Sequence, residues 1–518
     1  MKVNMKALLF VGLLATGLLM SAVAKASDIE EVIVIGANTS YGYADPETDY
    51  SLIEALDPTR TYQPGGIGGF VGATTHGTDT KHTTVYRNGI PVNDPGSGWY
   101  DFGTELPTFQ TMTAISGPNS ALYGSSSMAG TILMEDNFDG KNMFMRLGDD
   151  MYSIQGGTES FHLSTYKGSN GSVRTDNTEE DWFENVTLKT KKEFGQWNMI
   201  TVLQDYKYDY DNCWFGLDGN DCVQEGFKTD VSIRGDWLTI GYSLNDVKHN
   251  TGWESKNERY FVDANKEVIP GLVIGAQNNQ EKYNDAWDNR TAGYLNYNIN
   301  EHYGLGYRFE ENEHIYRLGY ESGGFKLSFA NSFRKPNLYE RYGDDWVFGN
   351  PNLQPEKGKG VEASIIGITL WHYEFSQSID YNFSTSSYIN AGGYDSTGIK
   401  YNKNWMLDEG NLNVFLGYTD SDRIRVPEQR IRISWSGTST DGRLDYRLAY
   451  IGQYNKGNDF DGSPIDDVST FNFNLGYYIT PKYRLGFQIR DILDRDFEIL
   501  PNYGAGGREF SLSLDLSL

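Results

Sequence analysis

The stretch FNFNLGYYITPKYRLGFQIR at residues 471–490 sets the fold of this chain, because apolar and polar side chains alternate along it. The apolar set on the two sides of the turn TPK consists of Phe471, Phe473, Leu475, Tyr477 and Ile479, then Tyr483, Leu485, Phe487 and Ile489. A period of two places each set on one face of an extended chain. The stretch therefore predicts two antiparallel strands joined by a tight turn.

The same alternation runs through the chain from about residue 140 to its end. Counting the segments gives close to 22 expected strands, with cores at 142–149, 152–159, 160–168, 182–194, 196–208, 227–234, 237–249, 257–265, 271–280, 291–299, 303–310, 314–322, 325–334, 358–366, 368–379, 397–405, 411–419, 429–437, 443–453, 469–479, 483–492 and 508–518. Residues 138–518 supply about 17 positions per strand, which leaves room for a spanning core of about ten residues and a short loop.

Two details favour a membrane barrel over a soluble, secreted β-protein. The positions between the apolar ones carry charges and amides, and Tyr and Trp gather near the segment ends, where the aromatic girdle of a membrane barrel lies. We therefore expect an all-β membrane protein, an antiparallel transmembrane β-barrel of about 22 strands. An even strand count returns both ends of the barrel to the periplasmic side, and a lumen of this width is usually plugged.

The composition agrees with a barrel. The chain has 518 residues, with 44 Lys and Arg against 70 Asp and Glu, and a mean hydropathy of −0.54. Alternation accounts for this low hydropathy, since only every second strand residue faces lipid. The net charge of −26 excludes nucleic acid as a partner, because a polyanion would be repelled. The aromatic content of 14% argues against disorder.

Residues 1–26 have the form of an export signal. Lys2 and Lys6 precede an apolar run at 7–20, and small residues at 24 and 26 allow cleavage before Ser27. A membrane anchor is the alternative, but the run is shorter than the ~20 residues that a spanning helix needs. Cleavage removes three lysines, so the mature chain has 44 − 3 = 41 basic and 70 acidic residues, a charge of −29. We expect the mature chain in the outer membrane.

Residues 28–137 lack the alternation and carry motifs instead. The runs VYRNGIPVND at 85–94 and ISGPNSALYGSSSMAGTI at 115–132 are followed, in the barrel region, by FRKPNLYE at 333–340 and GNPNLQPEK at 349–357. In order and spacing these runs resemble motifs of the TonB-dependent outer-membrane receptors. Within that family, the small size and the barrel motifs are nearest to the vitamin B12 transporters.

The resemblance implies a division of the whole chain. Its expected parts are a signal peptide at 1–26, a TonB-box segment at 27–38, a small α+β plug domain at 39–137 inside the lumen, and the transmembrane barrel at 138–518. Three features depart from the family pattern. The plug is short, Ser116 stands where the family has an Arg that ties plug to barrel acids, and Leu518 replaces the usual terminal aromatic residue. We therefore expect a different network between plug and barrel.

The run EEVIVIG at 30–36 resembles the TonB box. An extended, β-branched run near the N-terminus can add as a strand to the sheet edge of a periplasmic partner. The expected box residues are Glu31, Val32, Ile33, Val34 and Ile35. The alternative is that these residues form the first strand of the plug's own sheet.

The run NDPGSGWYD at 93–101 is the expected apical loop of the plug. Aromatic rings there could stack on a ligand and carboxylates could hydrogen-bond to it, and a loop at 342–348 is expected on the same side. The candidate ligand-binding residues are Asp94, Trp99, Tyr100, Asp101 and Trp346. The alternative is that they pack the plug against the barrel wall.

One expected loop is rich in acidic residues and holds both cysteines. Its members are Asp205, Asp209, Asp211, Asp218 and Asp221, with Cys213 and Cys222. Two cysteines nine apart in an oxidising compartment predict a disulfide. The aspartates could supply oxygen ligands for a structural Ca²⁺, as the resemblance to vitamin B12 transporters also implies. The alternative is an acidic, solvated loop, since the spacing is not that of an EF-hand.

No arrangement of residues predicts an enzyme. None of the seven histidines has HxxxH or HExxH spacing, and we expect His76 and His82 to be polar surface residues of the plug rather than ligands. No cofactor is required, and the structural Ca²⁺ considered above is an optional addition.

The resemblance implies a monomeric receptor that takes up a scarce nutrient with energy from TonB. Its expected partners are TonB, membrane lipid and a small-molecule ligand. Cobalamin or a metal chelate such as a ferric siderophore is the leading ligand class, and haem and oligosaccharides stay open. The alternative is a passive porin-like channel or a surface receptor that TonB does not energise, which the short plug and Ser116 motivate.

Overall fold

A computed structural model describes most of the chain. The described residues are 38–41, 59–62, 71–104, 110–138, 142–149, 151–169, 182–209, 223–250, 252–408, 410–459, 462–495, 497–500, 503–504 and 507–517. All of them belong to one compact unit, residues 32–518. The expected signal peptide lies outside the described residues, as does the TonB-box segment apart from Asn38.

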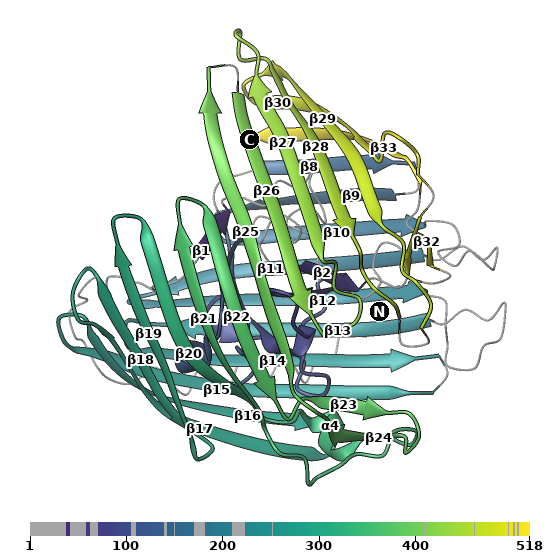
Figure 1. Ribbon diagram of the computed structural model, residues 1–518. Coiled ribbons are helices and arrows are strands. Elements are labelled where there is room, and N and C mark those ends of the chain that lie inside the picture. The colour runs from purple at the N-terminus through teal and green to yellow at the C-terminus, as the bar shows by residue number, and fades with distance from the viewer. Residues whose placement is uncertain are drawn as a thin grey trace. The chain divides into compact units, whose positions relative to one another are not determined.

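Twenty-two of the described strands form one closed barrel (Figure 1). In chain order they are β8 (Asn142–Gly148), β9 (Met151–Thr158), β10 (Phe161–Ser169), β11 (Trp182–Phe194), β12 (Trp197–Asp209), β13 (Val223–Arg234), β14 (Leu238–His249), β15 (Glu254–Ile269), β16 (Leu272–Tyr283), β17 (Ala286–Asn298), β18 (Tyr303–Glu310), β19 (Glu313–Ser322), β20 (Phe325–Arg334), β21 (Glu356–Ile365), β22 (Ile368–Ser376), β25 (Tyr394–Leu407), β26 (Gly410–Ser421), β27 (Gln429–Thr438), β28 (Leu444–Tyr454), β29 (Val468–Thr480), β30 (Tyr483–Arg490) and β33 (Glu509–Ser517). Each pairs antiparallel with its neighbours, and β33 closes on β8 with Leu514 opposite Met145.

The barrel confirms the strand count expected from alternation. The opening stretch forms β29 and β30, with Leu475 opposite Phe487 across the ladder. One predicted core, 368–379, is too long. The strand β22 ends at Ser376 because Gln377 has a φ of 58°, which leaves the extended conformation. Ile379 then begins a separate hairpin of β23 (Ile379–Asn382) and β24 (Ser387–Asn390), and another loop holds β31 (Glu498–Leu500) and β32 (Tyr503–Gly504).

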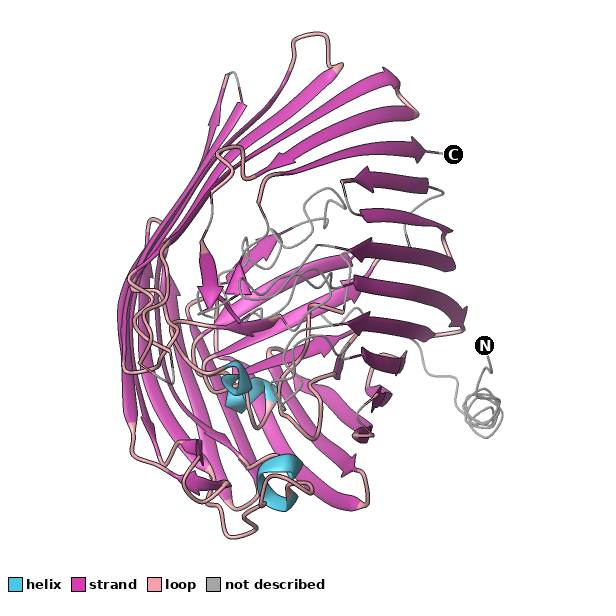
Figure 2. Cartoon of the chain, turned by 90° about the vertical axis from the view of Figure 1, so that its right-hand side faces the viewer, coloured by secondary structure: helices cyan, strands magenta, loops and turns pink. Residues whose placement is uncertain are grey.

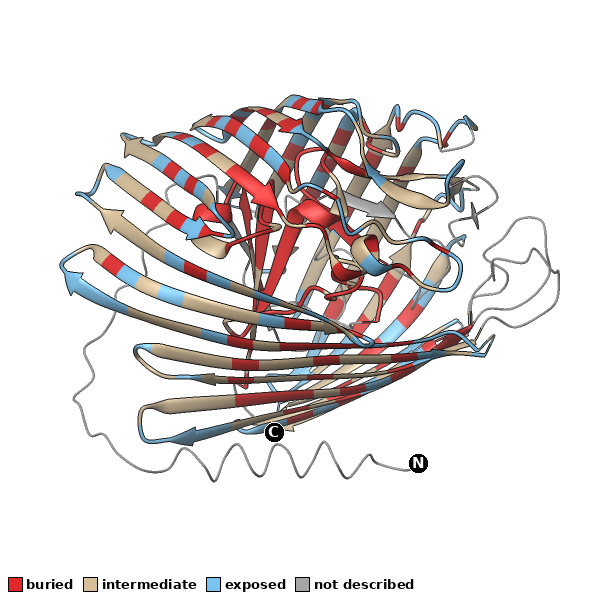
Figure 3. Ribbon diagram, turned by 90° about the horizontal axis from the view of Figure 1, so that it is seen from below, coloured by how far each residue is buried: buried red, intermediate tan, exposed pale blue. Residues whose placement is uncertain are grey.

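The barrel is polar inside and apolar outside. On β19, Arg317 is 4% exposed while its neighbour Leu318 is 50% exposed, and on β21 the pair Glu362 and Val361 repeats the contrast. Figure 3 shows the resulting stripes of buried and exposed residues along the strands. A soluble protein would bury the leucine and expose the arginine. This inverted pattern is the one that a lipid-facing barrel requires.

The N-terminal part forms a small plug, whose strands lie within the ring of barrel strands in Figure 2. Its elements are β1 (Asn38–Tyr41), β2 (Thr59–Tyr62), β3 (Gly72–Thr74), η2 (Thr80–His82), β4 (Thr83–Arg87), β5 (Ile90–Pro91), β6 (Gln110–Ser116), α3 (Ser120–Tyr123) and β7 (Gly130–Asp136). Five of the strands make one sheet in the order β1-β6-β7-β4-β5. The expected boundary at 137–138 falls between β7 and β8.

The plug packs its own core and also shares residues with the barrel. Its apolar cluster includes Val85, Ile90 and Ile132, and the barrel residue Phe261 belongs to the same cluster. The helix α3 contacts β18, β19 and β20. No helix among the described residues is both long and apolar enough to cross a membrane.

Candidate ligand-binding site

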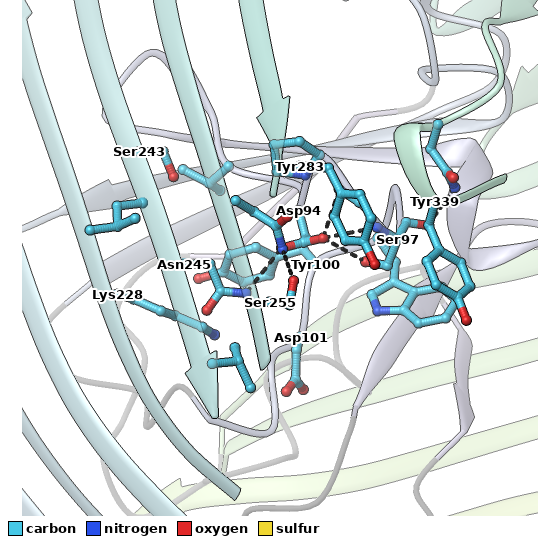
Figure 4. Close-up of a pocket in the computed structure, with 18 of the residues that line it drawn as sticks. Asp94, Ser97, Tyr100, Asp101, Lys228, Ser243, Asn245, Ser255, Tyr283 and Tyr339 are labelled. Carbon is cyan, nitrogen blue, oxygen red and sulfur yellow. Dashed lines mark hydrogen bonds between the residues drawn. The ribbon is translucent and has the colours of Figure 1, made fainter. Parts of the chain in front are cut away.

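The apical loop of the plug, residues 93–101, is folded by Asp94. Its Oδ1 accepts hydrogen bonds from the backbone N–H groups of Gly96 and Ser97 at 2.9 and 2.8 Å, which closes an Asx turn. Its Oδ2 accepts from the Nδ2 atoms of Asn245 and Asn257 at 3.0 and 2.7 Å. Figure 4 shows these bonds converging on the Asp94 carboxylate. One carboxylate therefore shapes the loop and fastens it to β14 and β15.

A second contact joins the apical loop to the helix α4 (Leu338–Tyr342). Asn337 caps this helix and donates from Nδ2 to the carbonyl oxygen of Ser97 at 2.8 Å. The backbone N–H of Tyr339 donates to the carbonyl oxygen of Gly96 at 3.1 Å. Gly96 must lack a side chain, because a Cβ there would lie 2.6 Å from the ring of Tyr283. The loop after β20 thus rests directly on the plug apex.

A cavity of about 350 Å³ lies between the apical loop, the ends of β12 to β16, and α4. This volume is within the range of small-molecule sites. Eight aromatic side chains line it: Trp99, Tyr100, Tyr206, Tyr208, Trp253, Tyr283, Tyr339 and Tyr388. Flat rings of this number suit a ligand with apolar faces and hydrogen-bonding edges.

The charged groups of the cavity are already paired or shielded. The Nζ atom of Lys228 lies 5.6 Å from the ring centroid of Tyr100 and 5.3 Å from that of Tyr206, and donates a hydrogen bond to Thr104. Burial raises the pKa of Tyr388 to about 12, so its hydroxyl group stays protonated at neutral pH. The cavity therefore offers rings and neutral hydrogen-bonding groups more than free charge.

Four of the five predicted ligand-binding residues line this cavity, namely Asp94, Trp99, Tyr100 and Asp101. The fifth, Trp346, is 66% exposed and lies outside the lining. Part of this set also packs the plug against the barrel wall, which was the alternative interpretation. Both carboxylate oxygens of Asp94 accept hydrogen bonds from the protein, and Tyr100 is buried.

Sequence reasoning missed the wall residues of the cavity. Tyr206, Tyr208 and Tyr283 sit at strand ends, where tyrosines were assigned to the lipid girdle, yet each is less than 9% exposed. The inward register of each strand was the signal that could have found them.

A buried ionic network ties the plug to the barrel beside this cavity. Lys81 donates from Nζ to Glu340 Oε1 at 3.1 Å, and His82 Nε2 lies 2.8 Å from Glu356 Oε2. Arg334 pairs with both carboxylates, at 2.8 Å to Glu340 and 2.6 Å to Glu356. His82 is 1% exposed, so the expectation of a surface histidine is wrong for it.

The network accounts for the two barrel motifs. Arg334 and Glu340 belong to the first and Glu356 to the second, and Glu340 also completes the capping box of α4. Burial lowers the pKa of Lys81, but the carboxylates of Asp79 and Glu340 outweigh it and hold that pKa above its usual range. Lys81 therefore stays charged within the lumen.

Comparisons with known proteins agree with this architecture. Residues 50–131 match the TonB-dependent Receptor Plug Domain. The chain combines the plug and the barrel of the TonB-dependent receptor family. It is 23% identical to the vitamin B12 transporter BtuB of Vibrio cholerae serotype O1, over 89% of this chain and 88% of that one.

Solved structures share the receptor's fold at low sequence identity. The ferric enterobactin receptor of Pseudomonas aeruginosa, as a variant bound to enterobactin, has a TM-score of 0.69 and 12% identity over 94% of this chain and 100% of that chain. The siderophore receptor PirA of Acinetobacter baumannii has a TM-score of 0.68 and 14% identity over 93% and 98%. The copper transporter OprC gives 0.67 and 14% over 94% and 99%. The receptor is an outer-membrane protein, and its relatives are transporters and receptors rather than enzymes.

The receptor engages the barrel differently at Ser116. Glu362 accepts hydrogen bonds from the Ser116 hydroxyl at 3.2 Å and the Tyr373 hydroxyl at 2.8 Å. The guanidinium in this region comes from the barrel, because Arg317 donates from Nη1 to the plug carbonyl oxygen of Pro118 at 2.8 Å. The barrel therefore supplies the cation beside Ser116.

His76 adjoins this cluster and is fully buried, so the expectation of a surface residue is wrong for it too. Its ring stacks on Trp371 with centroids 4.1 Å apart. Since Tyr373 donates to Glu362, its hydroxyl accepts from His76 Nδ1, and His76 Nε2 accepts from Lys400 at 3.2 Å. Burial lowers the pKa of His76 to about 4. The imidazole is therefore neutral at pH 7.

A third tie joins the other side of the plug to β11. The carboxylate of Asp136 accepts from Arg87 at 2.8 Å, Asn88 at 2.7 Å and the barrel residue Lys189 at 2.6 Å. Burial raises the pKa of Asp136, but the charges of Arg87 and Lys189 outweigh it and hold that pKa below its usual range.

The remaining predicted site residues fall largely outside the described residues. These are Glu31, Val32, Ile33, Val34 and Ile35 of the TonB box, the acidic-loop residues Asp211, Asp218 and Asp221, and the cysteines Cys213 and Cys222. On β12, Asp205 is exposed and Asp209 is buried. The residues that the structure describes include no group of three or more His, Cys, Asp or Glu able to hold a metal ion.

Proposed function

We propose that the receptor imports a scarce nutrient, cobalamin or a metal chelate such as a ferric siderophore, with energy delivered through TonB. The observation that carries this proposal is the cavity built jointly by the plug apex and the barrel. A ligand in this cavity contacts the plug and the barrel wall at the same time. The names of the relatives, a vitamin B12 transporter, siderophore receptors and a copper transporter, support the ligand class.

Coupling runs from the cavity to the plug through the loop that carries α4. Tyr339 lines the cavity, and one residue later Glu340 binds Lys81 of the plug. A ligand that shifts Tyr339 therefore acts on an element that holds the plug. A pull on the N-terminal box would then have to break the buried pairs at Lys81 and Asp136, which keep the plug seated until force arrives.

The test separates binding from uptake. Ile33→Pro removes a backbone N–H donor and so blocks strand addition to TonB. Ile33→Val keeps that donor and the ability to pair as a strand, and is therefore the matched control. We expect Ile33→Pro to bind ligand at the cell surface like the parent receptor and to lose uptake. Unchanged uptake in Ile33→Pro would contradict the proposal. The ligand is identified by growth of a strain lacking the receptor on limiting vitamin B12 against limiting iron.

A further inference from the structure

A second, smaller cavity of about 40 Å³ lies deeper along the same wall. The two cavities follow one another along the plug and the barrel. On the plug, Asp94 lines the outer cavity and its neighbour Asn93 lines the inner one. On β15, Asn257 lines the outer cavity, and Arg259, two residues further along the strand, lines the inner one. The inner cavity is bounded on the plug side by Tyr86 and its neighbours.

Three arginines of the barrel wall line the inner cavity: Arg259, Arg290 and Arg308. Two carboxylates pair with them, Glu281 with Arg259 and Arg290, and Glu310 with Arg308 at 2.5 Å. Glu281 lies outside the lining, so the charged residues that line the inner cavity sum to 3 − 1 = +2. The outer cavity has two lysines against Asp94, Asp101, Asp230 and Glu340, or 2 − 4 = −2. The sign of the charge reverses between the two cavities.

Several polar atoms of the inner cavity have no hydrogen-bond partner among the described residues. They are Nη1 of Arg308, Nε of Arg290, the hydroxyl of Thr84 and Oδ1 of Asn279. Arg308 is 2% exposed and Thr84 is 4% exposed. Buried donors are seldom left unmatched, because each loses its hydration on burial. Three of the four atoms are donors, and two of these belong to cations.

The plug backbone closes the cavity at Gly124. A Cβ at this position would lie 2.9 Å from Nη2 of Arg308, and its φ of +84° is one that glycine adopts without strain. The absence of a side chain therefore lets the plug approach the guanidinium group and still leave space beside it.

We propose that the inner cavity is a binding site for a small oxyanion, best matched by a carboxylate group. Two guanidinium N–H groups and a hydroxyl supply the donors that carboxylate oxygens accept. A water molecule needs about 10–15 Å³ of such space, so a volume of about 40 Å³ admits a group of about three to four heavy atoms. The proposal does not rest on nutrient uptake, because acid binding can be measured on the purified receptor.

The test uses acetate as the probe. The midpoint of thermal unfolding of the purified receptor is followed against acetate concentration at constant ionic strength set with chloride, since a ligand of the native state raises it. We expect the midpoint to rise with acetate. Thr84→Val removes only an unmatched hydroxyl, so it should fold normally and bind acetate about fivefold more weakly, the effect of one hydrogen bond.

Thr229→Val is the matched control, because Thr229 is also a buried hydroxyl without a described partner and lines neither cavity. It should bind acetate like the parent. Arg308→Lys gives a second variant that keeps the charge beside Glu310, and it should also weaken binding. No response of the parent receptor to acetate, or equal responses of the two threonine variants, would overturn the proposal.

A second acid tells whether the carboxylate belongs to a larger ligand. The probe is 3-phenylpropionate, which adds an aromatic ring to the same carboxylate. Binding at least about tenfold tighter than acetate supports a carboxylate carried by a ligand that spans both cavities. Equal binding supports a free small acid. Binding of neither acid overturns the site.

Discussion

Glu340 joins the plug to the barrel and also stabilises α4. It completes the capping box of α4, accepts hydrogen bonds from both Lys81 and Arg334, and is 1% exposed. We predict that Glu340→Gln destabilises the native receptor by about 3–5 kcal/mol, because it leaves buried cations short of a partner. Thermal unfolding measures the loss, and hydrogen exchange should rise at η2. The control is Glu313→Gln, whose exposed pair with Lys357 is worth about 1 kcal/mol or less. Equal losses in both variants would count against a special role for the network.

His76 gives the plug a dependence on pH. Its folded pKa of about 4 lies below the usual 6.5, so the unfolded chain binds the proton more readily. Stability should therefore fall as pH drops from about 6.5 to about 4 and then level off, a loss on the order of 3 kcal/mol. Unfolding midpoints between pH 4 and 7 test this, with His76→Gln as the variant that lacks the contribution. The idea fails if the variant loses stability over that range as steeply as the parent.

Single residues were the least predictable scale. Nothing in the spacing of His76 or His82 distinguishes a buried histidine from an exposed one, because burial in a lumen arises from barrel closure rather than from local sequence. Trp346 looked like a ligand-binding residue from its type alone and stays outside the cavity. The apical residues Asp94 and Trp99 were reachable, because a turn motif fixed their position on the plug.

At the scale of elements, α4 and its loop link the cavity to the plug. Asn337→Ala removes the helix cap and the bond to Ser97, which we expect to cost about 1 kcal/mol or more. Backbone amides at 338–343 should then exchange faster, and ligand binding should weaken because Tyr339 lines the cavity. Asn382→Ala, which removes a similar bond to Ser384 in the exposed β23–β24 hairpin, is the matched control. Unchanged exchange at 338–343 would show that the cap is dispensable.

The strands could be predicted because the alternation of apolar and polar residues is a local signal present in every barrel segment. The structure of the loops was harder to predict. The hairpin β23–β24 and the helix α4 lie in polar stretches without periodicity, and their positions follow from contacts such as Asn337 with Ser97. The inward tyrosines of β12 were misassigned for a related reason, since a strand end alone does not tell which face meets lipid and which meets the plug.

At the scale of the whole molecule, the plug is held on opposite sides of the barrel. Asp136 binds Lys189 on β11, whereas Lys81 binds Glu340 after β20, nine strands further round a ring of 22. The two ties share no partner, so their contributions to plug release should add. In planar bilayers we expect the parent receptor to conduct little, Lys189→Met and Glu340→Gln each to open it rarely, and the double variant to open it in proportion to the product of the single effects. Asp445→Asn breaks the wall pair with Arg484 and should leave conductance unchanged. Steady conductance of the parent would instead favour a passive channel. It would contradict active uptake, which requires that the seated plug close the pore.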